Sequence, residues 1–303
     1  ANGMKTAQRS GIAFGTKVSL KAQHAEAAVL ETALDAAWRE IVRVEQAVSL
    51  FRSESAISRL NRDGVLDDPP ETLVQMLAQA LDIARLTDGA FDPTVQPLWK
   101  VYDAAFAAGR PATDSDVAAA GALIGFSGVE VGLKRIRLGR PGMALTLNGV
   151  AQGFATGRCL AVLGDHGIAN AFLDTGEIGA VGTHDDHSPW TAAIADPRQP
   201  GTFVALARPL AGVLATSGDY ATVWSDDFSH HHILDPKTRH SPPVTASVSV
   251  LAHSGGLADG LATAMMVMGP QKSIALAARL PGVEALIVTK SGERFQTPGF
   301  PFV

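Results

Sequence analysis

The sequence contains a single cysteine, Cys159, and this excludes an intrachain disulfide. Its helix-like context beside Leu160 favours a packed thiol over a nucleophile. Only 18% of the 303 residues are charged, and the formal net charge of −5 argues against a nucleic-acid partner or an anionic membrane surface. Long hydrophobic runs are also lacking, so the sequence predicts no transmembrane segment.

Hydrophobic residues nevertheless make up 46% of the chain, which is enough to bury a substantial core. We expect a single domain over residues 1–303, within which residues 1–145 and 146–303 could form two subdomains. No repeat, low-complexity tract or flexible linker divides the chain.

The spacing of apolar residues predicts the secondary structure. Helices are predicted at 25–50, 71–88, 117–125, about 150–163, 254–268 and 271–280. Strands are predicted at 11–20, 129–131, 135–138, 171–173, 190–195, 203–207, 212–215, 246–252 and 284–289. Because helices accompany mostly antiparallel strands without a regular βαβ alternation, we predict an α+β fold.

The apolar helix at 254–268 carries one carboxylate, Asp259, and one hydroxyl a turn later, Thr263. Residues i and i+4 share a helix face, so both oxygens point the same way. No Lys or Arg lies between Arg239 and Lys272 to pair with the carboxylate, which is costly to bury alone. Two interpretations follow: the pair binds a hard cation such as Mg²⁺, or Asp259 caps a helix start or accepts bonds from buried backbone amides.

Two further segments have site-like composition. Residues 89–95 form a loop in which Asp92, held extended before Pro93, can accept bonds from nearby amides; the alternative is a simple turn after a helix. Residues 146–153 place small residues where a strand passes into a helix, and the exposed amides of a helix start suit a phosphate. The segment lacks both the dinucleotide glycine pattern and the lysine of a phosphate loop.

Residues 215–220 and 230–236 are a second pair of loop segments, and the latter holds three adjacent histidines. Neighbours in sequence rarely converge on one zinc ion, so we expect one histidine to face a site and the others to be solvated. No Gly-x-Ser-x-Gly elbow occurs, which argues against a hydrolase triad.

Taken in order, these segments resemble the ApbE family, the FAD:protein FMN transferases. The resemblance covers nearly the whole chain, and the ordered set is far more specific than any one motif. Its pieces are Phe14-Gly15-Thr16, Phe51-Arg52 followed by Ser58-Arg59-Leu60-Asn61, Gly89-Ala90-Phe91-Asp92-Pro93-Thr94-Val95, Asn148-Gly149-Val150-Ala151-Gln152-Gly153, Thr216-Ser217-Gly218-Asp219-Tyr220, His232-Ile233-Leu234-Asp235-Pro236 and Leu257-Ala258-Asp259-Gly260-Leu261-Ala262-Thr263-Ala264.

The resemblance implies an ApbE-like, T-fold-related architecture and a Mg²⁺-dependent activity. The FMN part of FAD would pass to a Thr or Ser hydroxyl of an acceptor flavoprotein, with release of AMP. Asp259, Thr263 and the backbone carbonyl of Gly149 would hold the metal. His232 or Asp219 would assist deprotonation, although His232 could instead only position its loop. The FAD site would include Phe14, Phe51, Ala90, Phe91, Asp92, Thr146, Gln152 and Ile233.

The chain departs from the family pattern at two motifs. Thr146 and Gln152 replace the Asp and Lys of the family's Asp-Leu-Gly-Gly-Ile-Ala-Lys-Gly, which removes one acceptor and one cation from the nucleotide site. Leu173-Asp174-Thr175-Gly176-Glu177 stands where the family has Asn-Leu-Gly-Gly-Asp/Glu. These changes could mark a NosX-like subfamily dedicated to one acceptor.

Two other functions are compatible with the same site. One is an FAD pyrophosphatase that yields FMN and AMP, and the other is a non-catalytic accessory protein that binds FAD. The resemblance also implies a bacterial periplasmic location for a chain without its signal peptide. Respiratory membrane flavoproteins of the Nqr, Rnf or NosR types are the candidate acceptors.

Overall fold

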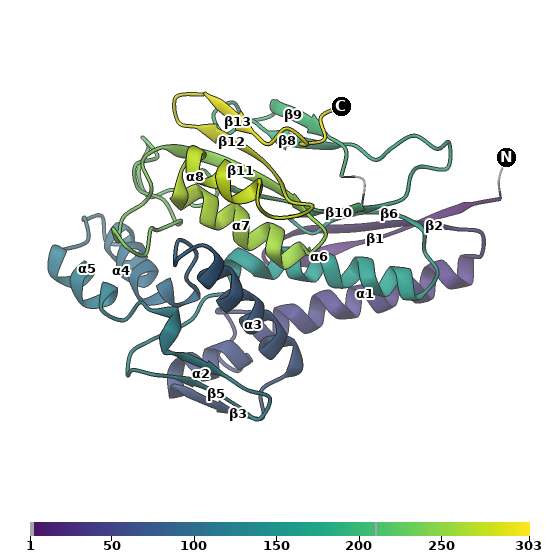
Figure 1. Cartoon of the computed structure of the whole chain (residues 1–303). Helices are drawn as coiled ribbons and strands as arrows, with labels where there is room; N and C mark the ends of the chain where they lie inside the picture. The colour runs from purple at the N-terminus through teal and green to yellow at the C-terminus, as the bar shows by residue number, and fades with distance from the viewer. Residues whose placement is uncertain (1–2, 210) are drawn as a thin grey trace.

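The computed structural model describes residues 3–209 and 211–303, and its centre is a large antiparallel sheet (Figure 1). The strands lie in the order β1-β2-β6-β7-β10-β11-β12-β13, and every neighbouring pair is antiparallel. Their bounds are β1 Lys5–Ala13, β2 Thr16–His24, β6 Asn170–Asp174, β7 Ile178–Val181, β10 Ala211–Gly218, β11 Thr245–Ala252, β12 Glu284–Thr289 and β13 Arg294–Gln296. The α+β prediction is confirmed.

Both faces of the C-terminal part of the sheet are covered, as the packing of strand β12 shows. Its residues alternate between the faces, as the two-residue period of a strand requires. Ala285 and Ile287 pack with α7 (Gly255–Met268) and α8 (Pro270–Ala277). Leu286 and Val288 pack on the other face with the small sheet of β8 (Ala192–Ala195) and β9 (Phe203–Ala207).

Helix α6 (Asn148–Asp165) packs against α7, and α1 (Ala27–Val48) packs against α6, so that the helical layer continues under the N-terminal strands (Figure 1). The rest of the N-terminal half forms a lobe below this layer. Its elements are α2 Ala56–Asp63, β3 Val65–Asp67, α3 Glu71–Leu86, η1 Pro93–Val95, α4 Gln96–Ala107, α5 Asp114–Gly121, η2 Phe126–Gly128, β4 Val129–Val131 and β5 Arg135–Leu138. Strands β3, β5 and β4 form a third sheet. No helix in the described ranges is both long and apolar enough to cross a membrane.

Helices α6 and α7 cross at two glycines, and this contact positions the site. A Cβ at Gly153 would lie 2.2 Å from the Gly255 carbonyl oxygen and 2.5 Å from the Asp259 Cβ. Real Cβ atoms do not approach so closely, so only glycine permits the two backbones to meet here. The contact places Asp259 of α7 against the first turns of α6.

Several expected elements differ in the structure. The single strand predicted at 11–20 is wrong: two strands turn at Phe14 and Gly15, which both have positive φ (51° and 72°), as a two-residue hairpin turn of the primed type requires. The strand expected before α6 is also wrong, because no strand precedes Asn148 directly. Strands β2 and β6 pair across the proposed division at residue 145, so both halves share one sheet.

Candidate active site

A cavity of about 560 Å³ opens between α6, α7, the end of β10 and the loops around residues 89–95 and 221–236. Most of the residues that the sequence analysis nominated line it. They are Phe51, Ala90, Phe91, Asp92, Thr146, Gly149, Gln152, His232, Ile233, Asp259 and Thr263. Segments far apart in the chain therefore meet in one cavity.

Two nominated residues, Phe14 and Asp219, are not among those that line the cavity. Phe14 lies in the β1–β2 turn, where its backbone N–H donates to Glu45 Oε1 at 2.8 Å and its ring packs against the core. The carboxylate of Asp219 is fully buried and accepts two bonds from Arg198, at 2.8 and 2.7 Å. This geometry argues against Asp219 as a base that receives a proton from a substrate in the cavity.

Asp259 is one of two buried carboxylates in the cavity wall. Its Oδ2 accepts a hydrogen bond from the Gly153 N–H at 2.9 Å. The prediction that Asp259 accepts a bond from a buried backbone amide is therefore confirmed. In a regular helix the Gly153 N–H would donate to the Gly149 carbonyl. Because this N–H also donates to Asp259, its hydrogen bond to the Gly149 carbonyl is weakened. Burial raises the pKa of Asp259, and the bond from Gly153 opposes the shift.

Glu177 is the second buried carboxylate, and it comes from the turn between β6 and β7. Its Oε2 accepts a bond from the Thr216 N–H at 2.8 Å. Burial, followed by the charge of Asp259, raises the pKa of Glu177. Within residues 3–209 and 211–303, neither Glu177 nor Asp259 forms an ion pair with a basic side chain.

Thr263 completes an oxygen-rich corner of the cavity. Its Oγ1 lies 3.1 Å from Ser217 Oγ on β10. Gly149, in the first turn of α6, approaches it so closely that a Cβ there would lie 3.0 Å from Thr263 Oγ1. Glycine at this position lets the backbone of α6 approach the hydroxyl. Leu147, the N-cap residue of α6, makes no side-chain cap, although the Asn148 N–H donates to Thr146 Oγ1 at 3.3 Å. The start of α6 therefore presents a positive helix end to the cavity.

Asp92 shapes the floor of the cavity through local hydrogen bonds. Its backbone is extended (φ −141°, ψ 113°), and its carboxylate accepts bonds from the Thr94 N–H at 2.8 Å and the Phe126 N–H at 3.1 Å. The prediction that Asp92 gathers nearby amides is confirmed. Burial raises the pKa of Asp92, and the bonds from Thr94 and Phe126 oppose the shift.

The three histidines have three different environments. His230 is exposed and His232 lines the cavity, but His231 is fully buried, so the expectation that both other histidines are solvated is wrong for His231. His232 Nδ1 lies 3.2 Å from the Thr222 carbonyl oxygen, which can only accept a bond. A proton on Nδ1 leaves Nε2 of the neutral ring as a free acceptor. Burial lowers the pKa of His232 and so favours this neutral form.

Several residues of the cavity wall were not predicted from the sequence. Glu177 appeared only within a motif that departs from the family, although a lone carboxylate after the Thr175-Gly176 turn was a usable signal. Trp99 and Lys100 lie on α4, a helix that was not predicted. Phe51 stands at the rim with 98% of its surface exposed.

The fold and the cavity thus define an α+β protein whose site combines two buried carboxylates, a histidine and the positive end of a helix. Residues 14–287 match the ApbE family, and the chain belongs to that family.

Known proteins of this family resemble the chain in sequence and in structure. The FAD:protein FMN transferase of Vibrio cholerae is 30% identical over 95% of this chain and 88% of its own length. That of Treponema pallidum is 31% identical over 86% and 78%, respectively. The solved flavin transferase ApbE from Vibrio cholerae superposes with a TM-score of 0.83 at 26% identity and covers 99% of this chain and 100% of its own. The ApbE protein from Thermotoga maritima gives a TM-score of 0.86 at 25% identity and 97% coverage of both chains.

Proposed function

We propose that this protein transfers the FMN moiety of FAD to a Thr or Ser hydroxyl of an acceptor flavoprotein and releases AMP. The observation that carries the proposal is the meeting of Asp259, Thr263, the start of α6 and His232 in one cavity. Curated relatives named FAD:protein FMN transferase, similar over most of their length, support the same reaction.

The oxygens around Asp259 fit a Mg²⁺ ion. Two buried carboxylates without a basic partner in the described chain call for a cation, and the glycine at 149 lets the backbone of α6 approach the Thr263 hydroxyl. Asp259, Thr263 and the Gly149 carbonyl would hold the ion, and these are the hard oxygen ligands that Mg²⁺ prefers. When bound, Mg²⁺ would supply charge neutralisation at the diphosphate of FAD.

The protein's own residues would position the two reactants. The positive end of α6 suits a phosphate of FAD. Buried apolar side chains such as Phe91 and Ile233 provide an apolar wall for its ring system. The acceptor oxygen attacks the FMN phosphorus, a new P–O bond forms, and the bond to the bridging oxygen breaks so that AMP leaves with that oxygen. His232 Nε2 takes the proton of the attacking hydroxyl.

The test is to mix the protein with FAD, Mg²⁺ and a candidate acceptor domain of the Nqr, Rnf or NosR type. We expect covalent flavin fluorescence on the acceptor in a denaturing gel, with AMP released in equal amount. Asp259→Ala should abolish both signals, whereas an unchanged rate in His232→Ala would remove His232 as the base. AMP without acceptor would indicate a pyrophosphatase instead, and bound FAD without AMP would indicate an accessory protein.

We infer a periplasmic location and a NosX-like dedication to one acceptor from the motifs that the chain shares with the family. The relatives are bacterial proteins, which is compatible with this location. Cell fractionation tests the location: an active protein found only in the cytoplasmic fraction would overturn it. A panel of acceptor domains tests the dedication, and equal labelling of all of them would count against it.

A further inference from the structure

His232 lies at the base of a hairpin-like loop that spans residues 222–232. Its backbone N–H donates to the Thr222 carbonyl at 3.0 Å, and Val223 and His231 form an antiparallel bridge. Thr222 and His232 both line the cavity, whereas Asp227, which accepts bonds from Ser225 and Ser229, belongs to the turn at the other end of the loop. The backbone pairing of the two arms connects this turn to the backbone of His232.

Phe228 in this turn is held by two basic side chains from other elements. Lys290 Nζ, just after β12, donates to the Phe228 carbonyl oxygen at 2.7 Å. The Arg198 guanidinium, in the β8–β9 loop, lies 4.1 Å from the centre of the Phe228 ring, a cation–π distance. Phe228 has φ +59°, a left-handed conformation that is unfavourable for a bulky residue, so its surroundings must hold it there.

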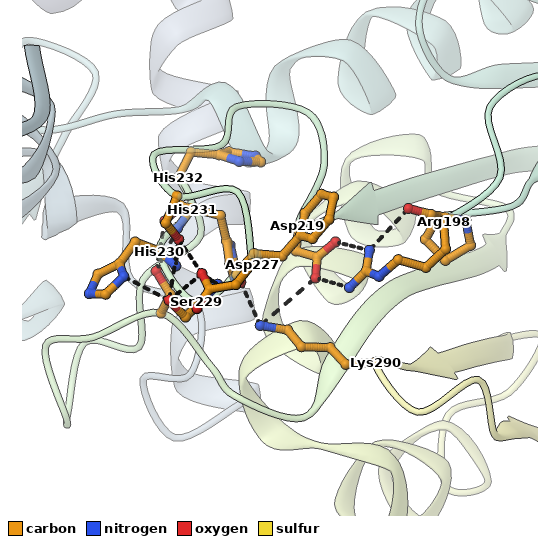
Figure 2. A network of polar contacts seen from close by, with 12 residues as sticks. Arg198, Asp219, Asp227, Ser229, His230, His231, His232 and Lys290 are labelled. Atoms are coloured by element: carbon orange, nitrogen blue, oxygen red, sulfur yellow. Dashed lines mark hydrogen bonds and ion pairs between the residues drawn. The ribbon is translucent and has the colours of Figure 1, made fainter.

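Asp219 joins the two basic side chains (Figure 2). It follows β10, its carboxylate is fully buried, and it accepts the two-pronged bond from Arg198 while lying 3.8 Å from Lys290 Nζ. Without this carboxylate the two cations would lie near each other with no shared counter-ion. Figure 2 shows the His232 ring directed away from this group of ion pairs.

We propose that Asp219 is a positioning residue for the transfer reaction: by orienting Arg198 and Lys290 against Phe228, it fixes the loop that presents His232 to the cavity. This inference rests on the proposed function of His232. It assigns Asp219 a role different from that of a base, because its carboxylate is already occupied by Arg198.

The loop has a second anchor that should keep an Asp219 variant folded. The Trp224 ring stacks on Tyr102 and Phe106 of α4, with centroid separations of 5.7 and 5.8 Å. Loss of the Asp219 carboxylate should therefore loosen the turn around Phe228 without releasing the whole loop. An error of about 1 Å in the placement of a reacting group can cost about 100-fold in rate.

The experiment is a double-mutant cycle of Asp219→Asn and His232→Ala, with kcat and KM for FAD measured at saturating Mg²⁺. We expect Asp219→Asn to lower kcat by roughly 10- to 100-fold while KM for FAD stays within about twofold. In the His232→Ala background, Asp219→Asn should cause no further loss of kcat. Asp88→Asn, which removes the carboxylate of an exposed ion pair with Lys237, is the matched control and should leave kcat unchanged.

Arg198→Lys is a second variant, which keeps the positive charge but loses the two-pronged bond to Asp219. It should lower kcat in the wild-type background but cause no further loss in the His232→Ala background. Amide hydrogen exchange over residues 222–232 gives a readout that needs no turnover, and it should become faster in Asp219→Asn but not in Asp88→Asn. Equal losses of kcat with and without His232, or unchanged exchange, would overturn the positioning role. Failure of the wild type to transfer FMN would overturn the proposed function, and the exchange result would still report on the loop.

Discussion

At the scale of single residues, Asp259 and Glu177 are groups of the site whose burial lowers the stability of the fold. Both carboxylates are buried, with 5% and 7% of their surfaces exposed, and burial raises the pKa of each. Each accepts one backbone N–H, but no basic side chain of the described residues meets them. Folding therefore carries a desolvation cost that a bound cation would offset.

Asp259→Asn should separate stability from cation binding. Without added metal, we expect the variant to unfold at the same temperature as the wild type or higher, because one buried charge is gone. Mg²⁺ added to the FAD-free protein at a hundred times its dissociation constant should stabilise the wild type by about 2.7 kcal/mol and the variant not at all. Thermal unfolding with and without Mg²⁺ measures both effects. A control, Asp82→Asn, changes a carboxylate that is 76% exposed and should behave as the wild type does.

His231 should make the protein sensitive to acid. Burial, followed by the charge of Lys290, lowers the pKa of His231 to about 3, whereas an unfolded histidine has a pKa near 6.5. Between these two pKa values His231 is protonated in the unfolded chain but neutral in the folded one. The contribution of His231 to the free energy of unfolding is therefore fully present above pH 6.5. It decreases as the pH is lowered towards 3, by at most about 1.4 kcal/mol per pH unit.

The comparison of wild type with His231→Gln isolates this contribution, because other groups titrate in both proteins. Urea unfolding at several pH values between 7 and 4 should show that the unfolding free energy of the wild type falls more steeply with decreasing pH than that of His231→Gln. Parallel curves for the two proteins would contradict the prediction.

The sequence was informative about which residues line the cavity but not about what each side chain does there. Motif order brought Gly149, His232 and Asp259 together correctly. The ion pair that occupies Asp219 joins it to Arg198, in a loop without a motif, and no spacing rule predicts such a long-range partner. The burial of His231 depends likewise on the neighbouring elements of the fold.

At the scale of elements, the close crossing of α6 and α7 explains why Asp259 reaches the first turns of α6. The crossing requires glycine on both helices, and the resulting backbone contact leaves no room for a methyl group at position 153. Helix packing here determines the geometry of the site.

Gly153→Ala tests this crossing against a matched substitution in the same helix. The added Cβ would lie 2.2 Å from the Gly255 carbonyl oxygen, so the helices must separate, at a cost of about 1–3 kcal/mol or more. Gly164→Ala adds a methyl group with nothing within 4 Å and should be neutral or stabilising by up to about 1 kcal/mol. Chemical denaturation measures both values, and equal stabilities for the two variants would exclude a tight crossing.

Elements bounded by clear turns were predicted well, and short or unusual ones were missed. The strands at 203–207 and 284–289 have the predicted bounds because each is an apolar run between breaking residues. Helix α4 was missed because Pro97 suggests a break, although proline is tolerated in the first turn of a helix, where it lies here. Strands β7 and β13 are only 4 and 3 residues long, and they are defined by their partners rather than by a period of their own.

At the scale of the whole molecule, strands from both halves of the chain form one sheet. β2 pairs with β6 over Ser19 to Gln23, and α1 packs against α6. The core on the helical side is therefore built from residues on either side of position 145. We expect the two proposed subdomains to depend on each other for stability.

Separate expression of residues 1–145 and 146–303 should yield two fragments without a cooperative unfolding transition, because each exposes a strand or helix face that the other covers. The full chain should instead unfold in one transition, with coincident curves from circular dichroism and tryptophan fluorescence. Two separated transitions in the full chain would contradict this expectation and favour independent subdomains.

The pairing of Ser19 with Asp174 also affects how the chain is made. The ribosome delivers the β1–β2 hairpin first, but the strand that it joins emerges about 150 residues later. At roughly 5–20 residues per second, the hairpin waits on the order of 10 to 30 s for its neighbour. Until the chain has grown past residue 174, the β2 edge of the hairpin has no partner strand, so the sheet cannot be completed earlier.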